Sequence, residues 1–552
     1  MIKKLYYIII FTFCIMMLLL NTISALGTNV TQKPIELRFG INYSPTGFDP
    51  VTMASDWDYI PNINACDTLI YPDPESIEGF KPWVADSWKI SPDGLKYTFY
   101  LKKGIPFHDG NEITAEDVLF TMDRILTVPG NIAAYFGELS VGSTKVIDKY
   151  TIEFNLKDKD PFFLESLMRC NILNKDLIME NIAEGPYGDF GDYGKTYLSM
   201  HDAGSGPFLV ESFKQGDYLI LKRFEDYPLV QRKLGSIDIV KFTIIPEVVT
   251  ITTKLLNGEF DMCTWALEGQ TFDKIKKDDR FEIEGMYLPV PWYIIMNVQK
   301  KPLDDIHVRK SIAYAYNLDQ VLTDILAGGK PLEGPFPEAI RGGCTGIKTY
   351  PFDLEKAQEE LKKSKYSMEE LKQFELDIAA VAGSQRFQNI ALLLASNLQK
   401  IGLNAQIKET RIQDIAEAAT TPETSPRLTI AKAAIANDVK SVMKMHSKLS
   451  FGEPGLNSTG WYTNAEADRL YEQALETIDP EERQNIFCEI QRIIAEDCPR
   501  IFSHEDFQQI PKWRYVKGFK APKTMIMYYE YRFENYYIDT QDPFFMENQD
   551  WY

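Results

Sequence analysis

The stretch from Phe80 to Ile125 constrains the fold of this chain more than any other part of its sequence. A turn sequence, Ser-Pro-Asp-Gly, leads into residues 97–101, where apolar and polar side chains alternate as in a β-strand with one buried face. A second turn, His-Asp-Gly, is followed by Thr114 and then by Asp117 three positions later, which is the pattern of a capping box at a helix start. An apolar face over residues 118–125 continues that helix. The stretch therefore predicts turn, strand, turn and helix, and it holds no group arranged to react chemically.

Length and composition predict a folded protein with two or more lobes. The chain has 552 residues, which exceeds what a single hydrophobic core usually supports. Hydrophobic residues make up 45% and aromatic residues 12% of it, so the chain has ample material for burial and is unlike a disordered protein. Strand and helix patterns alternate throughout, as in the strand expected at 35–41 and the helices expected at about 386–400 and from 480 onward. This alternation indicates an α/β fold.

The net charge of the chain argues against some classes of partner. It is −20 at pH 7, which disfavours binding to nucleic acid and to anionic membrane surfaces. Acidity of this size also suits a soluble protein with no particular partner, so it selects no substrate.

The amino terminus has the pattern of a secretory signal. Two lysines precede an almost unbroken apolar run from Leu5 to Leu20, and small residues lead to Ala25. We therefore expect residues 1–25 to be a signal peptide and the mature protein to be exported to the periplasm or another extracytoplasmic space. An uncleaved anchor is the alternative, but the run is short for a full membrane span. Cys14 lies inside the apolar run after a phenylalanine, where a lipoprotein cleavage box would need a small residue, so we expect no lipid anchor.

The cysteines of the mature chain permit disulfides without specifying their pairing. An even number in an exported protein allows bridges, but sequence alone does not assign them. No C-x-x-C pair occurs, which argues against a zinc site or a thioredoxin-like site. Cys488 and Cys498 are close in sequence and could pair if a helix ends between them, and buried free thiols are the alternative. The six mature cysteines are Cys66, Cys170, Cys263, Cys344, Cys488 and Cys498.

The stretch from Phe80 to Ile125 also resembles the signature of a known family, the peptide/nickel class of extracellular solute-binding proteins (family 5), which deliver ligands to ABC importers. In that family it is written roughly P-x-x-A-x-S-W-x-x-S-x-D-G-x-x-Y-x-F-x-L-R-x-G-V-x-F-H-D-G-x-x-x-T-A-x-D-V. The resemblance extends over nearly the whole mature chain, through shorter elements at 204–208, 257–261, 303–317 and 460–468. The matching signature positions are Pro82, Ala85, Ser87, Trp88, Ser91, Asp93, Gly94, Tyr97, Phe99, Leu101, Gly104, Phe107 to Gly110, Thr114, Ala115, Asp117 and Val118.

This resemblance implies a particular architecture. It is a two-lobed, periplasmic-binding-protein-like α/β fold of type II, which closes about a hinge of crossing strands and carries an extra domain inserted in the first lobe. Carried over to this chain, residues 33–70, 205–290 and 515–545 would form lobe I, residues 71–204 the inserted domain, and residues 291–514 lobe II.

No pattern in the sequence supports catalysis. The five histidines are scattered without metal-ligand spacing, and no H-E-x-x-H, G-x-S-x-G or phosphate-loop motif is present. His108 lies in a turn beside a glycine, and the resemblance implies a structural role for it. We therefore expect no catalytic residue, no metal site and no cofactor. A hydrolase of similar two-lobed shape is the rival interpretation, which turnover of a peptide substrate would favour.

The resemblance also suggests where a ligand would be held. Dipeptide-binding members hold the ligand carboxylate with an arginine just before a helix, and Arg386 lies two or three residues upstream of that position; a solvated cation is the alternative. A family element, W-x-x-D-x-x-D-P-D, carries aspartates that meet the ligand's amino group. Here only Asn437 and Asp438 match it, and residues 441–443 read Ser-Val-Met in place of D-P-D. A buried ammonium group without a carboxylate partner is costly, so free-amine dipeptides are disfavoured and Asp438 is a weak substitute anchor.

Aromatic residues complete the predicted ligand-binding set. Trp292, Trp461 and Tyr462 are candidates for the walls of a cleft, with core packing as the alternative for each. We expect a non-enzymatic receptor that captures a di- or oligopeptide by hinge closure and delivers it to ABC transporter permease subunits. A receptor for a nickel chelate or an oligosaccharide, or a sensor input without transport, is the alternative.

Overall fold

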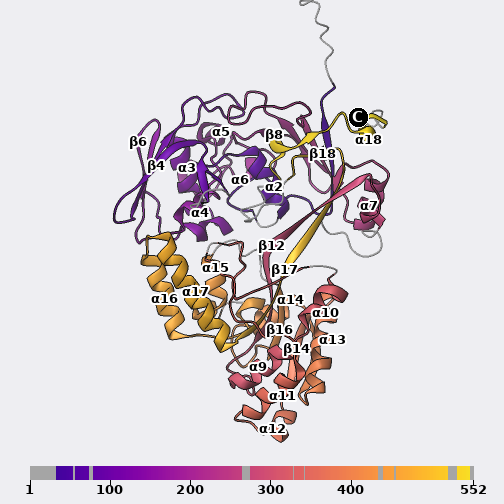
Figure 1. The fold of residues 1–552 in the computed structure, drawn as a ribbon. Coiled ribbons are helices and arrows are strands. Elements are labelled where there is room, and N and C mark those ends of the chain that lie inside the picture. The colour runs from indigo at the N-terminus through magenta and orange to yellow at the C-terminus, as the bar shows by residue number, and fades with distance from the viewer. Residues whose placement is uncertain are drawn as a thin grey trace, which may run out of the picture.

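Two lobes lie one above the other and are joined by two long strands (Figure 1), β12 (Phe281–Met296) and β17 (Arg500–Trp513). This arrangement confirms the prediction of a two-lobed α/β fold with strands running between the lobes. The predicted signal peptide, residues 1–25, lies outside the described residues, and within them no helix is both long and apolar enough to span a bilayer. The structure is a computed structural model that describes residues 33–53, 56–73, 79–263, 274–326, 329–340, 342–432, 439–452, 455–519 and 531–547.

One mixed β-sheet runs through both lobes. Strand β12 pairs antiparallel with β17 along most of its 16 residues, and its far end also pairs with β16, so β12 belongs to both lobes. The other pairings of this sheet are mixed. Strand β1 (Glu36–Ile41) is parallel to its neighbours in the first lobe and β14 (Glu375–Val381) to its neighbours in the second, as expected where helices connect strands, whereas the strands at the outer edge of the first lobe pair antiparallel. The sheet order in the described residues is β15 (Asn404–Thr410), β14 (Glu375–Val381), β16 (Leu428–Lys432), β12, β17, β11 (Met262–Cys263), β1 (Glu36–Ile41), β10 (Ile239–Ile244), β9 (Tyr218–Arg223) and β8 (Phe208–Lys214), with β13 (Lys330–Pro331) added on β17.

The first lobe is built around β1, which the alternation at 35–41 predicted. Its side chains at Leu37, Phe39 and Ile41 are buried. The Phe39 ring stacks on Phe242 of β10 with centroids 5.2 Å apart and meets Trp57 edge-on at 6.1 Å. Apolar burial of this kind accounts for most of the lobe's stability. Its remaining elements are α2 (Asp56–Ala65), α7 (Val248–Leu256), β18 (Val516–Lys517), η7 (Phe533–Asn535), β19 (Tyr537–Ile538) and α18 (Pro543–Glu547).

Beside the first lobe lies a smaller unit, here called the insert, which holds the described residues of 71–204. Its four-stranded sheet buries Tyr97, Phe99 and Leu101, as the alternation predicted. The Asp117 carboxylate accepts hydrogen bonds from the backbone N–H and the hydroxyl of Thr114, at 2.9 and 2.8 Å, so the predicted capping box is confirmed. The elements are β2 (Ile70–Pro72), β3 (Phe80–Pro82), β4 (Ala85–Ile90), β5 (Lys96–Leu101), α3 (Ala115–Thr127), η1 (Asn131–Phe136), β6 (Thr144–Asp148), β7 (Thr151–Asn155), α4 (Phe163–Leu167), α5 (Lys175–Glu180), η2 (Gly188–Phe190) and α6 (Lys195–Leu198).

Close backbone approaches attach the insert to the first lobe. At Gly204 an added Cβ would lie only 1.8 Å from the carbonyl oxygen of Ala65 at the end of α2, so no other residue fits there without moving the backbone. A buried ion pair adds to this attachment, because Arg124 of α3 donates two hydrogen bonds to the Asp49 carboxylate, at 2.6 and 2.7 Å. The exact residue limits of the lobes and of the insert remain a prediction.

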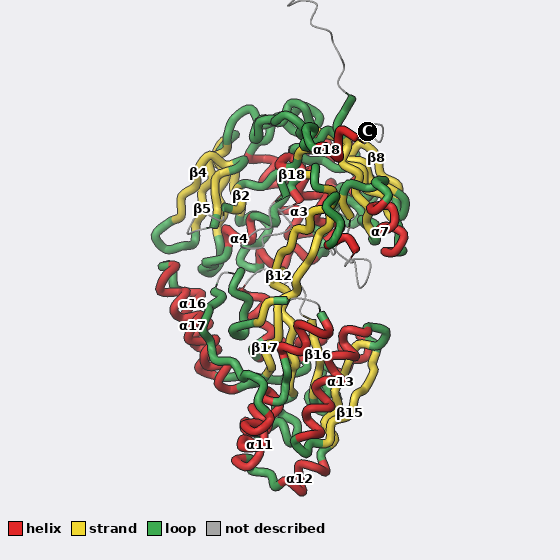
Figure 2. Tube along the Cα trace, turned by 45° about the vertical axis from the view of Figure 1, so that its right-hand side comes forward, coloured by secondary structure: helices red, strands yellow, loops and turns green. Residues whose placement is uncertain are grey.

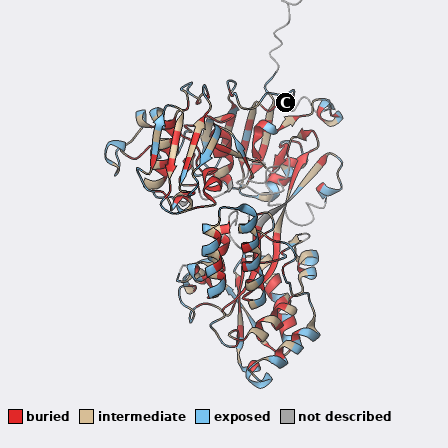
Figure 3. Cartoon of the chain, turned by 60° about the vertical axis from the view of Figure 1, so that its left-hand side comes forward, coloured by how far each residue is buried: buried red, intermediate tan, exposed pale blue. Residues whose placement is uncertain are grey.

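The second lobe packs helices on both faces of its part of the sheet (Figure 2). The helices expected at about 386–400 and from 480 are present as α13 (Gln385–Lys400) and α17 (Pro480–Asp497), the latter capped by Asp479. Buried positions follow the strands and the inward faces of these helices (Figure 3). The remaining elements are α9 (Ile306–Tyr314), α10 (Leu318–Gln320), the π-helical turn η3 (Val321–Ile325), α11 (Leu354–Lys363), α12 (Met368–Gln373), α14 (Ile412–Ala418), α15 (Val439–Met445), η4 (Lys448–Ser450), η5 (Leu456–Ser458) and α16 (Ala465–Glu476).

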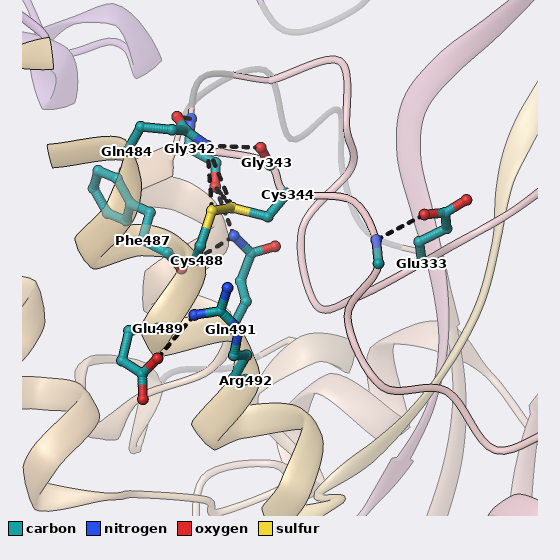
Figure 4. Close-up of a disulfide and its surroundings, with 11 residues drawn as sticks. Glu333, Gly342, Gly343, Cys344, Gln484, Phe487, Cys488, Glu489, Gln491 and Arg492 are labelled. Carbon is teal, nitrogen blue, oxygen red and sulfur yellow. Dashed lines mark hydrogen bonds and ion pairs between the residues drawn. A yellow bond between two sulfur atoms is a disulfide. The ribbon is translucent and has the colours of Figure 1, made fainter. Parts of the chain in front are cut away.

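A disulfide joins Cys344 to Cys488 of α17 (Figure 4). The pairing of Cys488 with Cys498, which the sequence left open, is therefore wrong. The two residues lie at the middle and the carboxyl end of one continuous helix, and a rise of about 1.5 Å per residue holds them roughly 15 Å apart. Cys498 is a buried free thiol, as are Cys66, Cys170 and Cys263.

Candidate ligand-binding site

Three neighbouring strands bring charged and aromatic side chains together between the lobes. Strands β16 and β12 pair so that Lys432 lies opposite Trp292. Strands β12 and β17 pair antiparallel with Pro291 opposite Glu505. Trp292 and Asp506 each follow one member of this pair, so they lie on the same face of the sheet as diagonal neighbours. The first turn of α13 then adds Arg386 from above the sheet. We call Trp292, Arg386, Lys432 and Asp506 the hinge cluster.

Asp506 is the centre of the hinge cluster. Its carboxylate accepts a hydrogen bond from the indole N–H of Trp292 at 3.0 Å. It also forms ion pairs with Lys432 at 2.7 Å and with Arg386 at 3.3 Å. Among the described side chains, two cations therefore share one carboxylate, which leaves one net positive charge at a place where the Arg386 and Lys432 side chains are 38% and 43% exposed. Such a site favours an anionic group on a ligand.

Trp292 is the buried aromatic member of the hinge cluster. Its ring stacks on His504 at 5.3 Å with 16° between the planes, and it meets Phe387 at 4.8 Å. The Arg386 guanidinium lies 5.8 Å from the same ring, within the range of a cation–π interaction. The indole is 2% exposed, so it acts mainly by holding Arg386 and Asp506 in place.

Two more ionisable residues of β17 adjoin the cluster. Burial lowers the pKa of His504 to about 4, so the imidazole is neutral near pH 7, and its Nδ1 lies 2.8 Å from the Ser503 hydroxyl. Burial raises the pKa of Glu505 to about 7, although Lys330 of β13 opposes the shift. Because successive side chains of a strand point to opposite faces, Glu505 faces away from the Asp506 side of the sheet.

The structure places the predicted site residues in different surroundings. Arg386 and Trp292 come together in the hinge cluster. Trp461 and Tyr462 are buried in the second lobe, where the Trp461 indole donates to the Ser425 hydroxyl at 2.8 Å and the Tyr462 hydroxyl donates to Asp497 at 2.7 Å. No contact recorded for the described residues joins either of them to the hinge cluster, and these bonds fit the packing alternative. Asn437 and Asp438 lie outside the described residues.

The substitution of Ser-Val-Met for D-P-D has a clear structural counterpart. Val442 and Met443 of α15 are fully buried in an apolar core of the second lobe. These two positions therefore offer no carboxylate to an amino group.

His108 is tied into the junction between the insert and the first lobe. Its Nδ1 lies 2.6 Å from a carboxylate oxygen of Asp202, and its Nε2 lies 2.9 Å from the Gly206 carbonyl oxygen. Because both neighbours are acceptors, both ring nitrogens donate and the imidazole carries a charge. Burial alone would lower the pKa of His108, but Asp202 outweighs it and the pKa is raised. This geometry is that of a structural ion pair.

Sequence reasoning missed Lys432 and Asp506. A signal for Asp506 exists, because three ionisable residues, His-Glu-Asp at 504–506, stand in succession within the strand pattern that runs from Ile501 to Ile510. Buried or half-buried charges in the middle of a strand need partners and are a reason to look for a site. Within the described residues, no group of three or more His, Cys, Asp and Glu side chains is placed to hold a metal ion.

Comparison with known proteins agrees with this architecture. Residues 79–446 match the family described as "Bacterial extracellular solute-binding proteins, family 5 Middle". The probable D,D-dipeptide-binding periplasmic protein DdpA of Escherichia coli K12 is 26% identical over 452 residues, which cover 79% of this chain and 81% of that protein.

Solved structures show the same fold. The periplasmic binding protein DppA from Helicobacter pylori, solved with the peptide STSA, has a TM-score of 0.69 at 25% identity and covers 92% of this chain and 99% of its own. The ABC transporter substrate-binding protein CtaP from Listeria monocytogenes has a TM-score of 0.78 at 23% identity, covering 92% of this chain and all of its own. The predicted periplasmic-binding-protein-like fold is confirmed, and the chain belongs to the bacterial extracellular solute-binding proteins of family 5.

Proposed function

We propose that the protein is an exported, non-enzymatic receptor that captures a peptide by its free carboxylate between the two lobes and delivers it to the permease subunits of an ABC importer. Contacts that both lobes make with the peptide would favour the closed form by their differential free energy. Micromolar capture requires about 8 kcal/mol in total. Among relatives, DdpA is named for D,D-dipeptides and the Helicobacter pylori DppA was solved with a peptide, which supports this class of ligand.

The hinge cluster is the observation that carries the proposal. Arg386 and Lys432 share the single carboxylate of Asp506, so a peptide carboxylate entering the site meets uncompensated positive charge. The planar guanidinium of Arg386 can form a fork of two hydrogen bonds with such a carboxylate.

The amino end of the ligand would be held differently from its carboxylate. Ser441 and Met443 stand at the two positions where the family element D-P-D carries aspartates, and Met443 is buried. We therefore propose that a free amino terminus contributes little to capture, and that N-acetylated and free-amine peptides bind with similar affinity.

The disulfide between Cys344 and Cys488 supports the export of the chain. Disulfides persist in oxidising compartments and are rare in the cytosol. Fractionation of the producing cell and amino-terminal sequencing of the mature protein test this part, and we expect cleavage after Ala25. A full-length cytosolic product would contradict it.

The ligand is to be identified by native mass spectrometry of the purified mature protein and then measured by calorimetry. We expect a co-purified peptide, and at least tenfold weaker binding when its carboxylate is amidated. A bound nickel chelate or oligosaccharide would replace the peptide assignment, and turnover of the peptide would contradict the receptor role.

Variants of two arginines test whether Arg386 contacts the carboxylate of the peptide. Arg386→Gln is expected to weaken capture of the free-carboxylate peptide at least tenfold and to leave the affinity for its amide almost unchanged. Arg411→Gln is the matched control, because Arg411 is also an ion-paired arginine at a helix start of the second lobe, with Asp414 at 2.8 Å. Equal losses in both variants, or the same loss for both peptides, would remove Arg386 from the site.

A further inference from the structure

The insert contacts the second lobe on the side away from the hinge strands. In Figure 1 helices α16 and α17 lie directly below β4 and α4, whereas β12 and β17 join the lobes on the other side. Phe162 of the insert is 2% exposed and belongs to an apolar core of the second lobe, with its ring 6.0 Å from that of Phe487. The Arg483 guanidinium of α17 lies 5.8 Å from the same ring. The two parts of the molecule therefore meet through a buried aromatic side chain.

A cavity of about 650 Å³ lies beside this contact. Its walls come from both parts, with Ile90, Tyr97 and Leu164 from the insert and Leu475 and Ile478 from the second lobe. Its volume is in the range of small-molecule sites, which often occur between domains and are mostly apolar. No residue of the hinge cluster lines it, so it is a separate place from the site described above.

Three charged side chains that line the cavity, Lys159, Asp160 and Arg483, have partners. Lys159 pairs with Glu476 at 3.0 Å, and Asp160 pairs with Lys440 at 2.7 Å. The Arg483 guanidinium donates to the backbone carbonyls of Thr477 and Ile478, at 2.9 and 3.1 Å. An anionic ligand group would have to displace one of the bonds of Lys159 or Arg483, whereas an apolar group would lose only its own contact with water.

Two large aliphatic side chains at the cavity remain exposed to solvent. Ile90 is 45% exposed and Ile478 is 55% exposed, and they come from opposite walls. The Ile478 side chain reaches the turn at Gly94, where an added Cβ would lie 3.7 Å from its terminal methyl group. A guest that covered both isoleucines would remove apolar surface from water on both walls at once.

We propose that this cavity is a second contact point for the captured solute and takes an uncharged, apolar group of it, such as an aliphatic or aromatic side chain. The inference rests on the proposed receptor function and assigns to its peptide an apolar side chain at a distance from the carboxylate. Since the walls belong to different lobes, the guest bridges the insert and the second lobe and adds to the free energy that favours closure.

The test uses N-phenyl-1-naphthylamine, an uncharged apolar fluorophore whose emission rises in apolar surroundings, with the mature full-length protein. We expect saturable binding that becomes at least tenfold weaker in Ile478→Lys and in Ile90→Lys. Each variant has a matched control, Ile412→Lys in the second lobe and Ile147→Lys in the insert, because these isoleucines are 46% and 57% exposed and do not line the cavity. Circular dichroism and unfolding midpoints establish that all four variants fold.

Three results would overturn the inference: no saturable binding by the wild-type protein, equal weakening in the control variants, or failure of captured peptides with apolar side chains to displace the fluorophore. Arg386→Gln separates this inference from the proposed function, because it is expected to weaken peptide capture without changing fluorophore binding. If no peptide binds the wild-type protein while Ile478→Lys and Ile90→Lys lose the fluorophore selectively, the peptide assignment fails and the cavity's preference for an apolar group stands.

Discussion

Removal of the disulfide between Cys344 and Cys488 is expected to destabilise the second lobe by up to about 5 kcal/mol. The bond closes a loop with a sequence separation of 144, and the loop-closure entropy of such a loop corresponds to about 5 kcal/mol at 25 °C. The loop has other attachments that survive the change. Gln484 donates to the Gly343 carbonyl at 2.8 Å and Gln491 donates to the Gly342 carbonyl at 2.6 Å. We therefore expect the lobe to fold with reduced stability rather than to unfold.

The assay is hydrogen exchange measured by mass spectrometry over α17 in the Cys344→Ala/Cys488→Ala double variant. A loss of this size accelerates exchange of the most protected amides by up to nearly four powers of ten. Wild-type protein treated with a reductant should show the same acceleration, and the double variant should not respond to the reductant. Cys170→Ala, which removes a buried free thiol of the insert, is the control and should leave exchange in α17 unchanged. Equal protection in the oxidised, reduced and double-variant proteins would refute the reasoning.

Three further changes have defined outcomes. Glu505 has a folded pKa of about 7 against an ordinary 4.5 because of its burial, so the wild-type protein loses stability as pH rises from 4.5 through 7. Glu505→Gln should therefore gain up to about 3 kcal/mol at pH 8 and little at pH 4.5 in urea unfolding; equal gains at both would contradict this cause. Asp202 raises the folded pKa of His108 against the effect of burial. The stability that the charged imidazole contributes is therefore complete below pH 6.5 and is lost as pH rises through the raised folded pKa. His108→Gln should flatten the decline of the thermal unfolding midpoint with rising pH. An unchanged pH profile of that midpoint would contradict this role of His108. Thr114→Ala should lower the free energy of unfolding of the insert by about 1 kcal/mol while Thr114→Ser costs little, because the hydroxyl is the part of the Thr114 side chain that takes part in the capping box.

Local features of the fold were readable from the sequence because each depends on neighbours within a few residues. The alternation at Tyr97, Phe99 and Leu101 gave a strand with these side chains buried, and Thr114 with Asp117 gave the start of α3. The helix starting after Asp479 was equally local, since a cap and a first-turn proline specify it together. Two lobes followed from length and from the family resemblance.

Long-range pairings were not readable. Cys344 and Cys488 are 144 residues apart, and no local pattern distinguishes that pairing from the other combinations. The hinge cluster is of the same kind, because Trp292 and Asp506 are separated by 214 positions and meet only through the register of β12 and β17. Trp461 and Tyr462 were candidates for cleft walls with core packing as the alternative, and the sequence alone could not assign the partners of their polar groups, Ser425 and Asp497.

The position of the hinge cluster along the strands links binding to the arrangement of the lobes. The pairing of β12 with β17 shifts register on both sides of Pro291, which lacks the N–H needed for a regular ladder. Irregular pairing of this kind lets a strand bend, and it occurs one residue from Trp292 and opposite Glu505. In the proposed function, a solute held by Arg386 and Lys432, which pair with Asp506 of β17, acts on the strand pair close to this irregular pairing. We therefore propose that the residues that attract the ligand also bias the angle between the lobes, so that capture and closure depend on one short segment of the chain.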